Sequence, residues 1–388
     1  MLFLGMFTLI TYLFRYKEKI KSVFFSYFYS KIAHLWNHPQ PNMKIFQCGH
    51  CQYPLFFENY SCANCGHLSG YRDLDRQMLT FDSESDRLIS DREKIEYKFC
   101  KNHQHGVCNW LIPIGSTVNF CTACQLNRTI PNLSDQENFP KWKNLEVAKH
   151  RLIYQLQKIG LPLPSKLKNA NGLCFDFVAR QANSQLMTGH ANGVITILLR
   201  EADSVLREQM RMQLMEPYRT LIGHLRHEVG HYFWDRLVYP DTGILANFRA
   251  IFGDERTSYR ESLKIYYKNG APDNWQENFI SKYATAHAWE DWAETWAHYL
   301  HIMDMVETAH FFGLKVDPSA TLEGMAANVS FDPYTQPDFQ AIVETCVPLS
   351  FAVNSINRAM GVPDVYPFII SQGVVDKMKF IHQLVNKD

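Results

Sequence analysis

The spacing of apolar residues changes near position 140, where helical periodicity begins. From Trp142 to Ile159 apolar residues recur at helical intervals until the run stops at Gly160, which predicts an amphipathic helix that ends at a glycine. The β-branched run 193–199 has the length of a buried strand, and the segment after Pro318 is expected to be mainly helical. Further helices are expected over three ranges, 203–215, 218–238 and 289–305. These elements predict an α+β domain over residues 140–388.

The first 42 residues follow a separate pattern. An apolar run over residues 1–14 is followed by a basic stretch between positions 15 and 21. The run is shorter than the roughly 20 residues of a membrane span, and it lacks the basic start and the small-residue cleavage site of a secretory signal. We expect Met43 to be the true start of a cytoplasmic protein. The alternative is a weak membrane anchor through residues 1–36.

The charges of the chain are balanced. Its 39 basic residues are matched by 39 acidic ones, so no global positive field would hold it on nucleic acid or on an anionic membrane. Nucleic acid is therefore not an expected partner. The length of 388 residues and the hydrophobic content of 46% are enough for two or three domains, at least one of them with a large core.

Eight of the ten cysteines lie between positions 48 and 124, in pairs. Such clustering indicates metal ligation and not disulfides. The first group consists of two C-x2-C pairs that supply four thiolates from two turns, the arrangement that a tetrahedral structural zinc needs. It predicts a zinc ribbon over residues 43–75. Its members are Cys48, Cys51, Cys62 and Cys65.

A second cysteine group is less regular but also adds up to four ligands, so we expect a second structural zinc within residues 97–131. Its members are Cys100, Cys108, Cys121 and Cys124. Two alternatives stay open: the thiols are reduced and bind no metal, or His103 or His105 replaces Cys100 as a ligand.

The segment His227-Glu228-Val229-Gly230-His231 matches the H-E-x-x-H pattern inside a predicted helix. Residues four apart share one face of a helix, so both imidazoles can bind one Zn²⁺. Glu228 lies beside the first of them and can take a proton from the metal-bound water. The alternative is a buried helix with two satisfied histidines.

A third metal ligand has to come from elsewhere in the chain. Trp234 and Leu237 stand where a metzincin has Gly and His, which excludes that class, and His224 is about 10 Å along the helix from the second histidine. Glu290 and Glu294 are one helical turn apart among tryptophans that imply burial, and buried carboxylates need partners.

This glutamate pair resembles the gluzincin pattern, in which the first Glu of an E-x-x-x-E helix binds the metal and the second orients a ligating histidine. The resemblance implies Glu290 as the ligand and Glu294 as the hydrogen-bond acceptor of His227 or His231. Asp291 points about 100° round the helix and is the weaker candidate. An exposed acidic helix is the alternative interpretation.

Together, the two motifs and the cysteine-rich front resemble the bacterial family of zinc-binding metallopeptidases with an N-terminal zinc ribbon, from about Met43 to near the C-terminus. The resemblance implies a zincin-like fold and peptide hydrolysis. The residues that carry it, besides Glu290 to Leu300, are Phe46-Gln47-Cys48, Leu55-Phe56-Phe57-Glu58-Asn59, Cys108-Asn109-Trp110-Leu111, Asn127-Arg128-Thr129-Ile130-Pro131, Tyr218-Arg219-Thr220, and Arg226 through Trp234-Asp235-Arg236.

The E-x-x-A-E form is also similar to the active-site helix of anthrax lethal factor. That similarity implies that Tyr283, seven residues before Glu290, stabilises the tetrahedral intermediate, and one such donor contributes a rate factor of about 10²–10³. His287 is a second candidate for this role, and a core tyrosine is the alternative. The stretch 253–259 is expected to line the substrate cleft, unless its acids are solvated or salt-bridged.

We therefore predict a zinc metallopeptidase with Glu228 as general base on a zinc-bound water. It would use one catalytic and one or two structural zinc ions and act on a peptide or protein substrate. One rival is a zinc-ribbon adaptor that binds protein or nucleic acid and carries a non-proteolytic zincin domain; the absence of Lys and Arg between Cys48 and Cys65 counts against the nucleic-acid version. Another is a hydrolase of a non-peptide bond.

Overall fold

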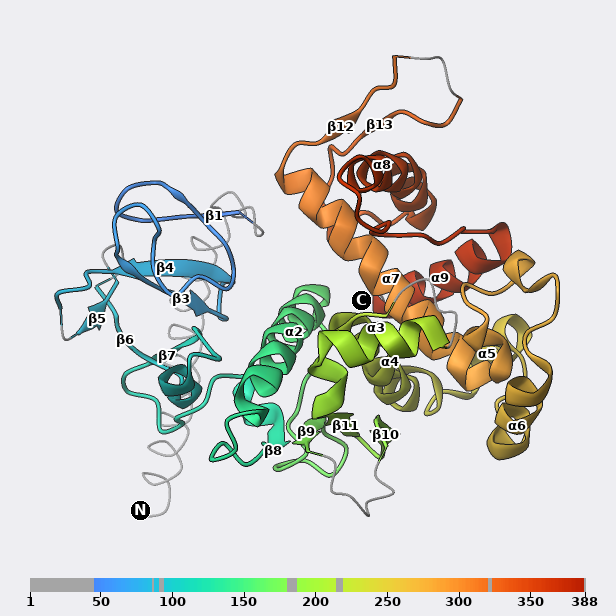
Figure 1. Cartoon of the computed structure of the whole chain (residues 1–388), viewed down its shortest axis with the longest axis horizontal. Helices are drawn as coiled ribbons and strands as arrows, with labels where there is room; N and C mark the ends of the chain where they lie inside the picture. The colour runs from blue at the N-terminus through green and yellow to red at the C-terminus, as the bar shows by residue number, and fades with distance from the viewer. Residues whose placement is uncertain are drawn as a thin grey trace, which may run out of the picture. The chain divides into compact units, whose positions relative to one another are not determined.

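The computed structural model describes residues 45–85, 87–90, 94–179, 187–213, 219–319 and 323–386. The expectations for residues 1–42, namely the start at Met43 and the membrane anchor, lie outside these residues. Within them, two small cysteine-containing modules are followed by a sheet and a group of long helices (Figure 1). The predicted α+β architecture with a mainly helical C-terminal part is confirmed.

The first module is built from two antiparallel strand pairs. β1 (Phe46–Gln47) pairs with β2 (Pro54–Leu55), and β3 (Leu68–Arg72) pairs with β4 (Gln77–Phe81). The Oγ1 of Thr80 in β4 accepts a hydrogen bond of 3.0 Å from the backbone N–H of Gly49. β4 therefore supports the turn that carries the first two cysteines.

The second module contains three antiparallel strands, β5 (Leu88–Ile89), β6 (Glu96–Phe99) and β7 (Leu111–Pro113). β5 lies within a charged stretch, residues 82–96, that joins the two modules. Arg87, the residue before β5, donates from Nε to Glu96 Oε1 of β6 at 2.9 Å, so opposite charges add to the pairing of the two strands. The turns η1 (Lys101–His105) and η2 (Cys124–Leu126) complete the module.

Aromatic side chains join both modules to the long helix α2 (Asn138–Ile159). The ring centroids of Tyr71 and Trp110 are 4.6 Å apart, and those of Phe57 and Tyr154 are 5.3 Å apart. Tyr154 belongs to α2, and both Tyr71 and Trp110 are fully buried. This shared core is one reason why the chain from Lys44 to Asp388 forms one compact unit.

A four-stranded sheet follows, with the strand order β10-β11-β9-β8. β8 (Asn127–Thr129), β9 (Cys174–Val178) and β11 (Val194–Leu198) are parallel, and β10 (Gly189–Ala191) is an antiparallel edge strand. β11 is the strand that the β-branched run predicted. The turn η3 (Leu199–Ala202) and helix α3 (Ser204–Gln213) come next.

Two helices cross closely at the centre of the helical part, α4 (Leu221–Phe233) and α7 (Ala288–Phe311). A Cβ added at Gly230 of α4 would lie 3.2 Å from the Cα of Ala293 in α7. Trp292 Nε1 donates to the carbonyl of Gly230 at 2.8 Å. Glycine at this position therefore permits the contact that brings the H-E-x-x-H helix against the second motif helix.

The remaining elements pack around α7. α4 continues as a π-helical turn, η4 (Trp234–Val238), in line with the predicted helix 218–238. In the described residues only α8 (Phe339–Ala359) is long and apolar enough to cross a membrane, a test that core helices of soluble proteins also pass. The other elements are α5 (Thr242–Phe252), α6 (Tyr259–Asn269), η5 (Trp275–Glu277), η6 (Tyr283–Ala286), β12 (Lys315–Val316), β13 (Ala327–Asn328), η7 (Pro333–Thr335), α8 (Phe339–Ala359) and α9 (Gln372–Val385).

Candidate active site and metal centres

The two histidines of the H-E-x-x-H segment lie one turn apart on α4. The helix begins at Thr220, whose side chain accepts a hydrogen bond from Gly223 N, as an N-cap residue should. The rings of His227 and His231 meet edge to face with centroids 4.9 Å apart. Their Nε2 atoms lie 3.1 Å and 3.6 Å from Oε2 of Glu290 on α7.

These three donor atoms fit a zinc ion. A tetrahedral zinc with ligand atoms at about 2.0–2.1 Å holds those atoms about 3.3 Å apart, and the two observed separations bracket this value. Glu290 Oε2 is buried, and no other described group hydrogen-bonds to it. Such an atom is costly to bury unless something binds it. One donor atom of each of the three residues lies within 4.8 Å of the other two, close enough to share one ion.

Glu294, the second glutamate of the E-x-x-x-E helix, lies behind His227. Glu294 Oε1 is 2.7 Å from His227 Nδ1, and Ser281 Oγ donates to Glu294 Oε2 at 2.6 Å. Burial acts to raise the pKa of Glu294, but the hydrogen bond and charge of His227, with the charge of His298 and the hydrogen bond from Ser281, together outweigh it and lower the pKa to about 2. Of the two histidines that the sequence left open, Glu294 thus pairs with His227. A proton on Nδ1 leaves Nε2 free to bind a metal.

The other histidine lies against an indole. The Trp289 ring centroid is 3.9 Å from that of His231, and His231 Nδ1 is buried without a hydrogen-bond partner among the described residues. His190 of the edge strand β10 lies 6.3 Å away by ring centroids. Burial and the charge of His231 lower the pKa of His190 to about 3. Residues of the sheet therefore reach the same region as the two helices.

Glu228 is buried beside the two histidines. Its Oε2 has no hydrogen-bond partner among the residues that the structure describes. Burial raises the pKa of this carboxyl, and the charges of His227 and His231 oppose the rise. An unpaired carboxylate oxygen in this place is free to accept a proton.

The two predicted oxyanion donors differ in their contacts. The ring of Tyr283 lies 6.1 Å from that of His227, and burial raises the pKa of its phenol, so it stays a donor. His287 instead caps α7: its Nδ1 accepts from Trp289 N at 3.0 Å, and its Nε2 lies 3.1 Å from the carbonyl oxygen of Thr257. With both ring nitrogens engaged by backbone, His287 has no free N–H for a substrate.

The sequence does not predict that Tyr259 contacts Glu290. The phenol of Tyr259 donates to Glu290 Oε1 at 2.6 Å. Tyr259 belongs to the stretch 253–259 that is expected to line the cleft. Two acids of that stretch, Asp254 and Glu255, are salt-bridged. No motif spacing joins positions 259 and 290. Ser281, behind Glu294, was missed for the same reason.

The two weaker ligand candidates lie in other contacts. Asp291 Oδ2 is 2.6 Å from Lys377 Nζ of α9, and burial raises the pKa of Asp291 to about 7. His224 Nδ1 is 3.5 Å from Glu201 Oε2. Neither side chain belongs to the group around Glu290.

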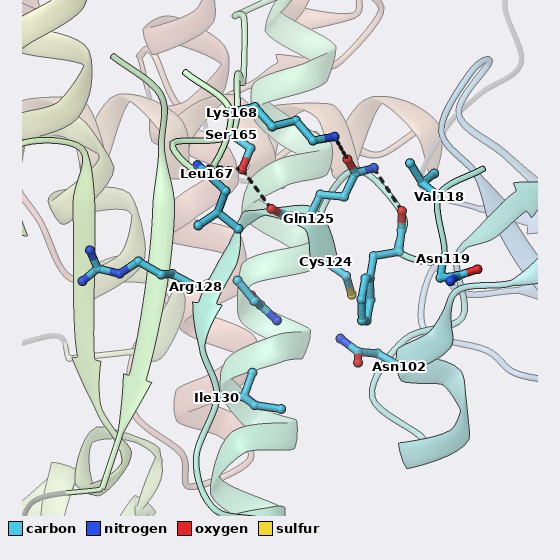
Figure 2. A pocket seen from close by; sticks show the side chains of 12 residues that line it. Asn102, Val118, Asn119, Cys124, Gln125, Arg128, Ile130, Ser165, Leu167 and Lys168 are labelled. Carbon is cyan, nitrogen blue, oxygen red and sulfur yellow. Dashed lines mark hydrogen bonds between the residues drawn. The ribbon is translucent and has the colours of Figure 1, made fainter. Parts of the chain in front are cut away.

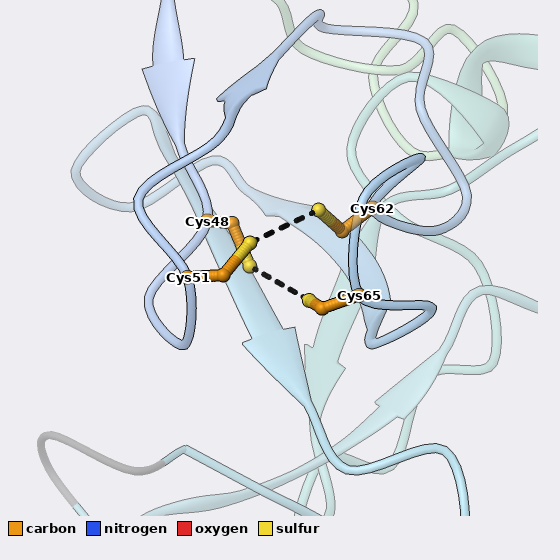
Figure 3. A group of neighbouring side chains, drawn as sticks. All are labelled: Cys48, Cys51, Cys62 and Cys65. Carbon is orange, nitrogen blue, oxygen red and sulfur yellow. Dashed lines mark hydrogen bonds between the residues drawn. The ribbon is translucent and has the colours of Figure 1, made fainter.

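The first cysteine group forms a compact cluster (Figure 3). Cys48 and Cys65 have their sulfurs 3.6 Å apart, as do Cys51 and Cys62. Tetrahedral zinc with Zn–S bonds of about 2.3 Å separates the sulfurs by about 3.8 Å, whereas a disulfide needs about 2.05 Å. The geometry therefore fits a zinc site and not a pair of disulfides.

The second cysteine group is equally compact and entirely buried. The sulfurs of Cys108 and Cys121 are 3.7 Å apart, and the four cysteines are grouped as candidate ligands. His103 stacks on Phe99 and its Nδ1 lies 3.0 Å from the carbonyl oxygen of Cys108, and neither His103 nor His105 belongs to the group. His150 of α2 places Nε2 at 3.7 Å from the sulfur of Cys124.

A cavity of about 440 Å³ adjoins this second cluster, between the second module and the sheet (Figure 2). Gln125 links two sides of it: Lys168 Nζ donates to Gln125 Oε1 at 3.1 Å, and Gln125 Nε2 donates to the carbonyl of Phe120 at 3.0 Å. None of the residues around Glu290 lines it. The cavity is thus separate from the histidine–glutamate site.

Comparison with known proteins agrees with this arrangement. Residues 138–384 match the family described as "Putative zinc-binding metallo-peptidase", and residues 45–135 match a zinc-ribbon domain. Uncharacterized proteins of Mycobacterium bovis and Mycobacterium tuberculosis are 39% identical to the chain over 346 residues, which is 89% of this chain and 96% of theirs. No solved structure matches the chain significantly. The chain belongs to this family of zinc-binding metallopeptidases and carries an N-terminal zinc ribbon.

Proposed function

We propose that the chain is a zinc-dependent peptidase of the gluzincin type that hydrolyses peptide bonds in a peptide or protein substrate. The observation that carries the proposal is the position of Glu290 Oε2. It lies 3.1 Å and 3.6 Å from the two histidine Nε2 atoms, with Glu294 behind the first histidine. Three protein ligands are what a catalytic zinc takes, because its fourth position must stay open.

When bound, the zinc polarises the scissile carbonyl and lowers the pKa of water. Glu228 then acts as the general base: its carboxylate takes the proton of the attacking water and passes it to the leaving amine. Burial, which raises the pKa of Glu228, brings its basicity closer to what this transfer needs. Its unpaired oxygen supports the role, because no competing hydrogen bond has to be broken.

Tyr283 is the residue that we assign to the oxyanion. Its buried phenol keeps its proton and can donate a hydrogen bond to the oxygen that becomes negatively charged. His287 is not a second donor in this proposal, since its ring nitrogens are used by Trp289 and Thr257. We assign it the structural task of fixing the start of α7.

The two cysteine clusters would hold one structural zinc each, which gives three zinc ions per chain together with the catalytic one. Thiolate clusters of this kind persist in a reducing compartment, and we propose a cytoplasmic location for that reason. The modules reach the peptidase part through α2, so they would also stabilise it.

The test is cleavage of a complex peptide mixture by the zinc-loaded protein, with new peptide ends identified by mass spectrometry. We expect cleavage by the wild type and a rate about 10²–10⁴-fold lower for Glu228→Gln, which loses the general base. Glu344→Gln is the matched control, because Glu344 is an exposed residue of α8 and the same substitution there should leave the rate unchanged.

Two outcomes contradict the proposal. If wild-type protein with three bound zinc ions cuts no peptide in the mixture, the chain is not a general peptidase and the adaptor is favoured. If Glu228→Gln cuts as fast as the wild type, Glu228 is not the base. Metal analysis of both proteins is required in either case, because a variant that has lost zinc says nothing about proton transfer.

A further inference from the structure

The two oxygens of the Glu290 carboxylate have different surroundings. Oε2 is the atom that faces His227 Nε2 and His231 Nε2 at 3.1 Å and 3.6 Å. Oε1 accepts a hydrogen bond of 2.6 Å from the phenol of Tyr259. Glu290 itself is only 1% exposed, so its oxygens depend on protein partners and not on water.

Tyr259 is held in place by the start of α7, the helix that carries Glu290. His287 Nε2 lies 3.1 Å from the carbonyl oxygen of Thr257, two residues before Tyr259. The Tyr259 ring also lies edge to face against His287 and Trp289, with centroids 5.3 Å and 6.0 Å apart. The phenol and the carboxylate that it contacts are therefore fixed to one helix terminus.

Tyr259 also stands at the first position of α6, after the N-cap residue Ser258. Its phenol is the donor and Glu290 Oε1 the acceptor, because a carboxylate offers no proton. Hydrogen bonds of this kind to metal-binding carboxylates orient the ligand and tune its metal affinity.

We propose that Tyr259 is the positioning residue of Glu290: its phenol holds Oε1, so that Oε2 alone is offered to the metal. A carboxylate held by one oxygen cannot close over the ion with both, which leaves room for a water and a substrate carbonyl. The inference rests on the proposed function in taking the His227, His231 and Glu290 group as the catalytic zinc site.

The test is the zinc affinity of Tyr259→Phe, which removes the hydroxyl and keeps the ring. Competition with a chromogenic chelator measures the affinity, and Glu290→Ala gives the baseline of the two cysteine clusters. We expect the dissociation constant of this site to rise about 10- to 100-fold. The visible spectrum of cobalt in the site should change as well, because it reports ligand number and geometry.

Tyr267→Phe is the matched control, since Tyr267 lies on the same helix and is 68% exposed. It should leave both readouts unchanged. Thermal unfolding of proteins that keep the zinc of the two cysteine clusters, with Glu290→Ala for comparison, checks that Tyr259→Phe has not merely destabilised the fold.

An unchanged zinc dissociation constant in Tyr259→Phe, or an equal rise in Tyr267→Phe, would overturn the inference. Its failure is distinguishable from failure of the proposed function. A wild type that cuts peptides while Tyr259→Phe keeps full zinc affinity retains the function and loses the inference. If the wild type cuts no peptide but Tyr259→Phe binds zinc more weakly, the inference is retained and the proposed function is lost.

Discussion

In the first cysteine cluster Cys51 and Cys65 are partly exposed, whereas all four cysteines of the second cluster are buried. The first cluster forms where two turns of small hairpins face each other (Figure 3), and a side chain of its own module, Thr80, supports it. The second includes Cys124, which opens the turn that leads directly into β8 of the sheet. Both clusters consist of four cysteine sulfurs, but the first lies at the edge of the fold and the second lies where the second module joins the sheet.

Helix α2 makes the second cluster part of the main domain. His150 lies between the sulfur of Cys124, 3.7 Å from Nε2, and the carbonyl oxygen of Glu146, 2.7 Å from Nδ1. The Glu146 carboxylate accepts a hydrogen bond of 2.6 Å from Asn127 of β8 and lies 2.8 Å from Lys149 Nζ. A chain of buried polar contacts therefore runs from the cluster into the helix and the sheet.

The helix also reaches the proposed active site. Gln155 of α2 accepts a hydrogen bond of 3.0 Å from Arg226, the residue before His227. The same Gln155 donates to the carbonyl of Leu300 in α7 at 2.7 Å. One four-cysteine cluster thus serves a local fold, whereas a chemically equal cluster supports the domain that carries the proposed active site.

The largest effect is expected for Cys124→Ser. A structural zinc contributes about 10–16 kcal/mol in small zinc domains, so loss of a ligand should remove at least about 4 kcal/mol from the free energy of unfolding of the helical part. At about 2–4 °C per kcal/mol for a domain of this size, the midpoint of thermal unfolding should fall by about 10 °C or more. Circular dichroism follows this transition, and metal analysis should show one zinc fewer.

Cys51→Ser is the matched substitution in the first cluster. It should also remove one zinc, yet the helical transition should move by less than about 4 °C, the equivalent of about 1 kcal/mol. Equal shifts for Cys51→Ser and Cys124→Ser would break the comparison, because both clusters would then be coupled to the main domain alike.

A smaller effect is expected for His150→Phe. Phenylalanine keeps the shape of the ring, but it offers no donor to the Cys124 sulfur or to the Glu146 carbonyl. A hydrogen bond to a charged acceptor contributes about 1.5–3 kcal/mol, so we expect a destabilisation of that size with the zinc retained. Chemical unfolding measures it. If His150→Phe is as stable as the wild type, α2 does not stabilise the second cluster through His150.

A still smaller effect should follow from His103→Ala. The sequence leaves His103 open as a zinc ligand in place of Cys100. In the structure its ring stacks on Phe99, with centroids 3.8 Å apart. Loss of that contact and of one neutral hydrogen bond should cost about 1 kcal/mol, and the zinc content should stay constant. A missing zinc in His103→Ala, with zinc retained in Cys100→Ser, would replace the four-sulfur assignment by one with a histidine.

Much of this arrangement could be predicted because local spacing encodes it. His227 and His231 are neighbours on one helix face, and two cysteines in a C-x2-C pair share one turn. Glu290 is 63 positions after His227 in the sequence; its helical repeat with Glu294 among tryptophans made it a candidate, and the resemblance to the gluzincin pattern implied that it is the ligand. In each case the helix or turn that the spacing predicts is also the element that positions the residue.

What the sequence did not reveal depends on contacts between distant segments. Tyr259 meets Glu290 only after α6 and α7 have packed, and His150 meets Cys124 only through the placement of α2. β5 was hidden in a charged stretch because its stabilising partner, Glu96 of β6, is on another strand. The contacts of His287 with Thr257 and Trp289 are likewise not encoded in its own segment, since composition does not tell a capping side chain from a reacting one.

The smallest effect is expected at the surface link between the first module and α2. Arg151 of α2 and Glu58 form an ion pair whose side chains are 55% and 33% exposed. Exposed pairs contribute about 0–1 kcal/mol, so Arg151→Ala and Glu58→Ala should each change the free energy of unfolding by less than about 1 kcal/mol. A double-mutant cycle at low and high salt measures their coupling. A coupling above about 2 kcal/mol that persists in high salt would mean that the first module is fastened to the main domain by this pair. The two clusters would then differ less in their support of the fold than their burial indicates.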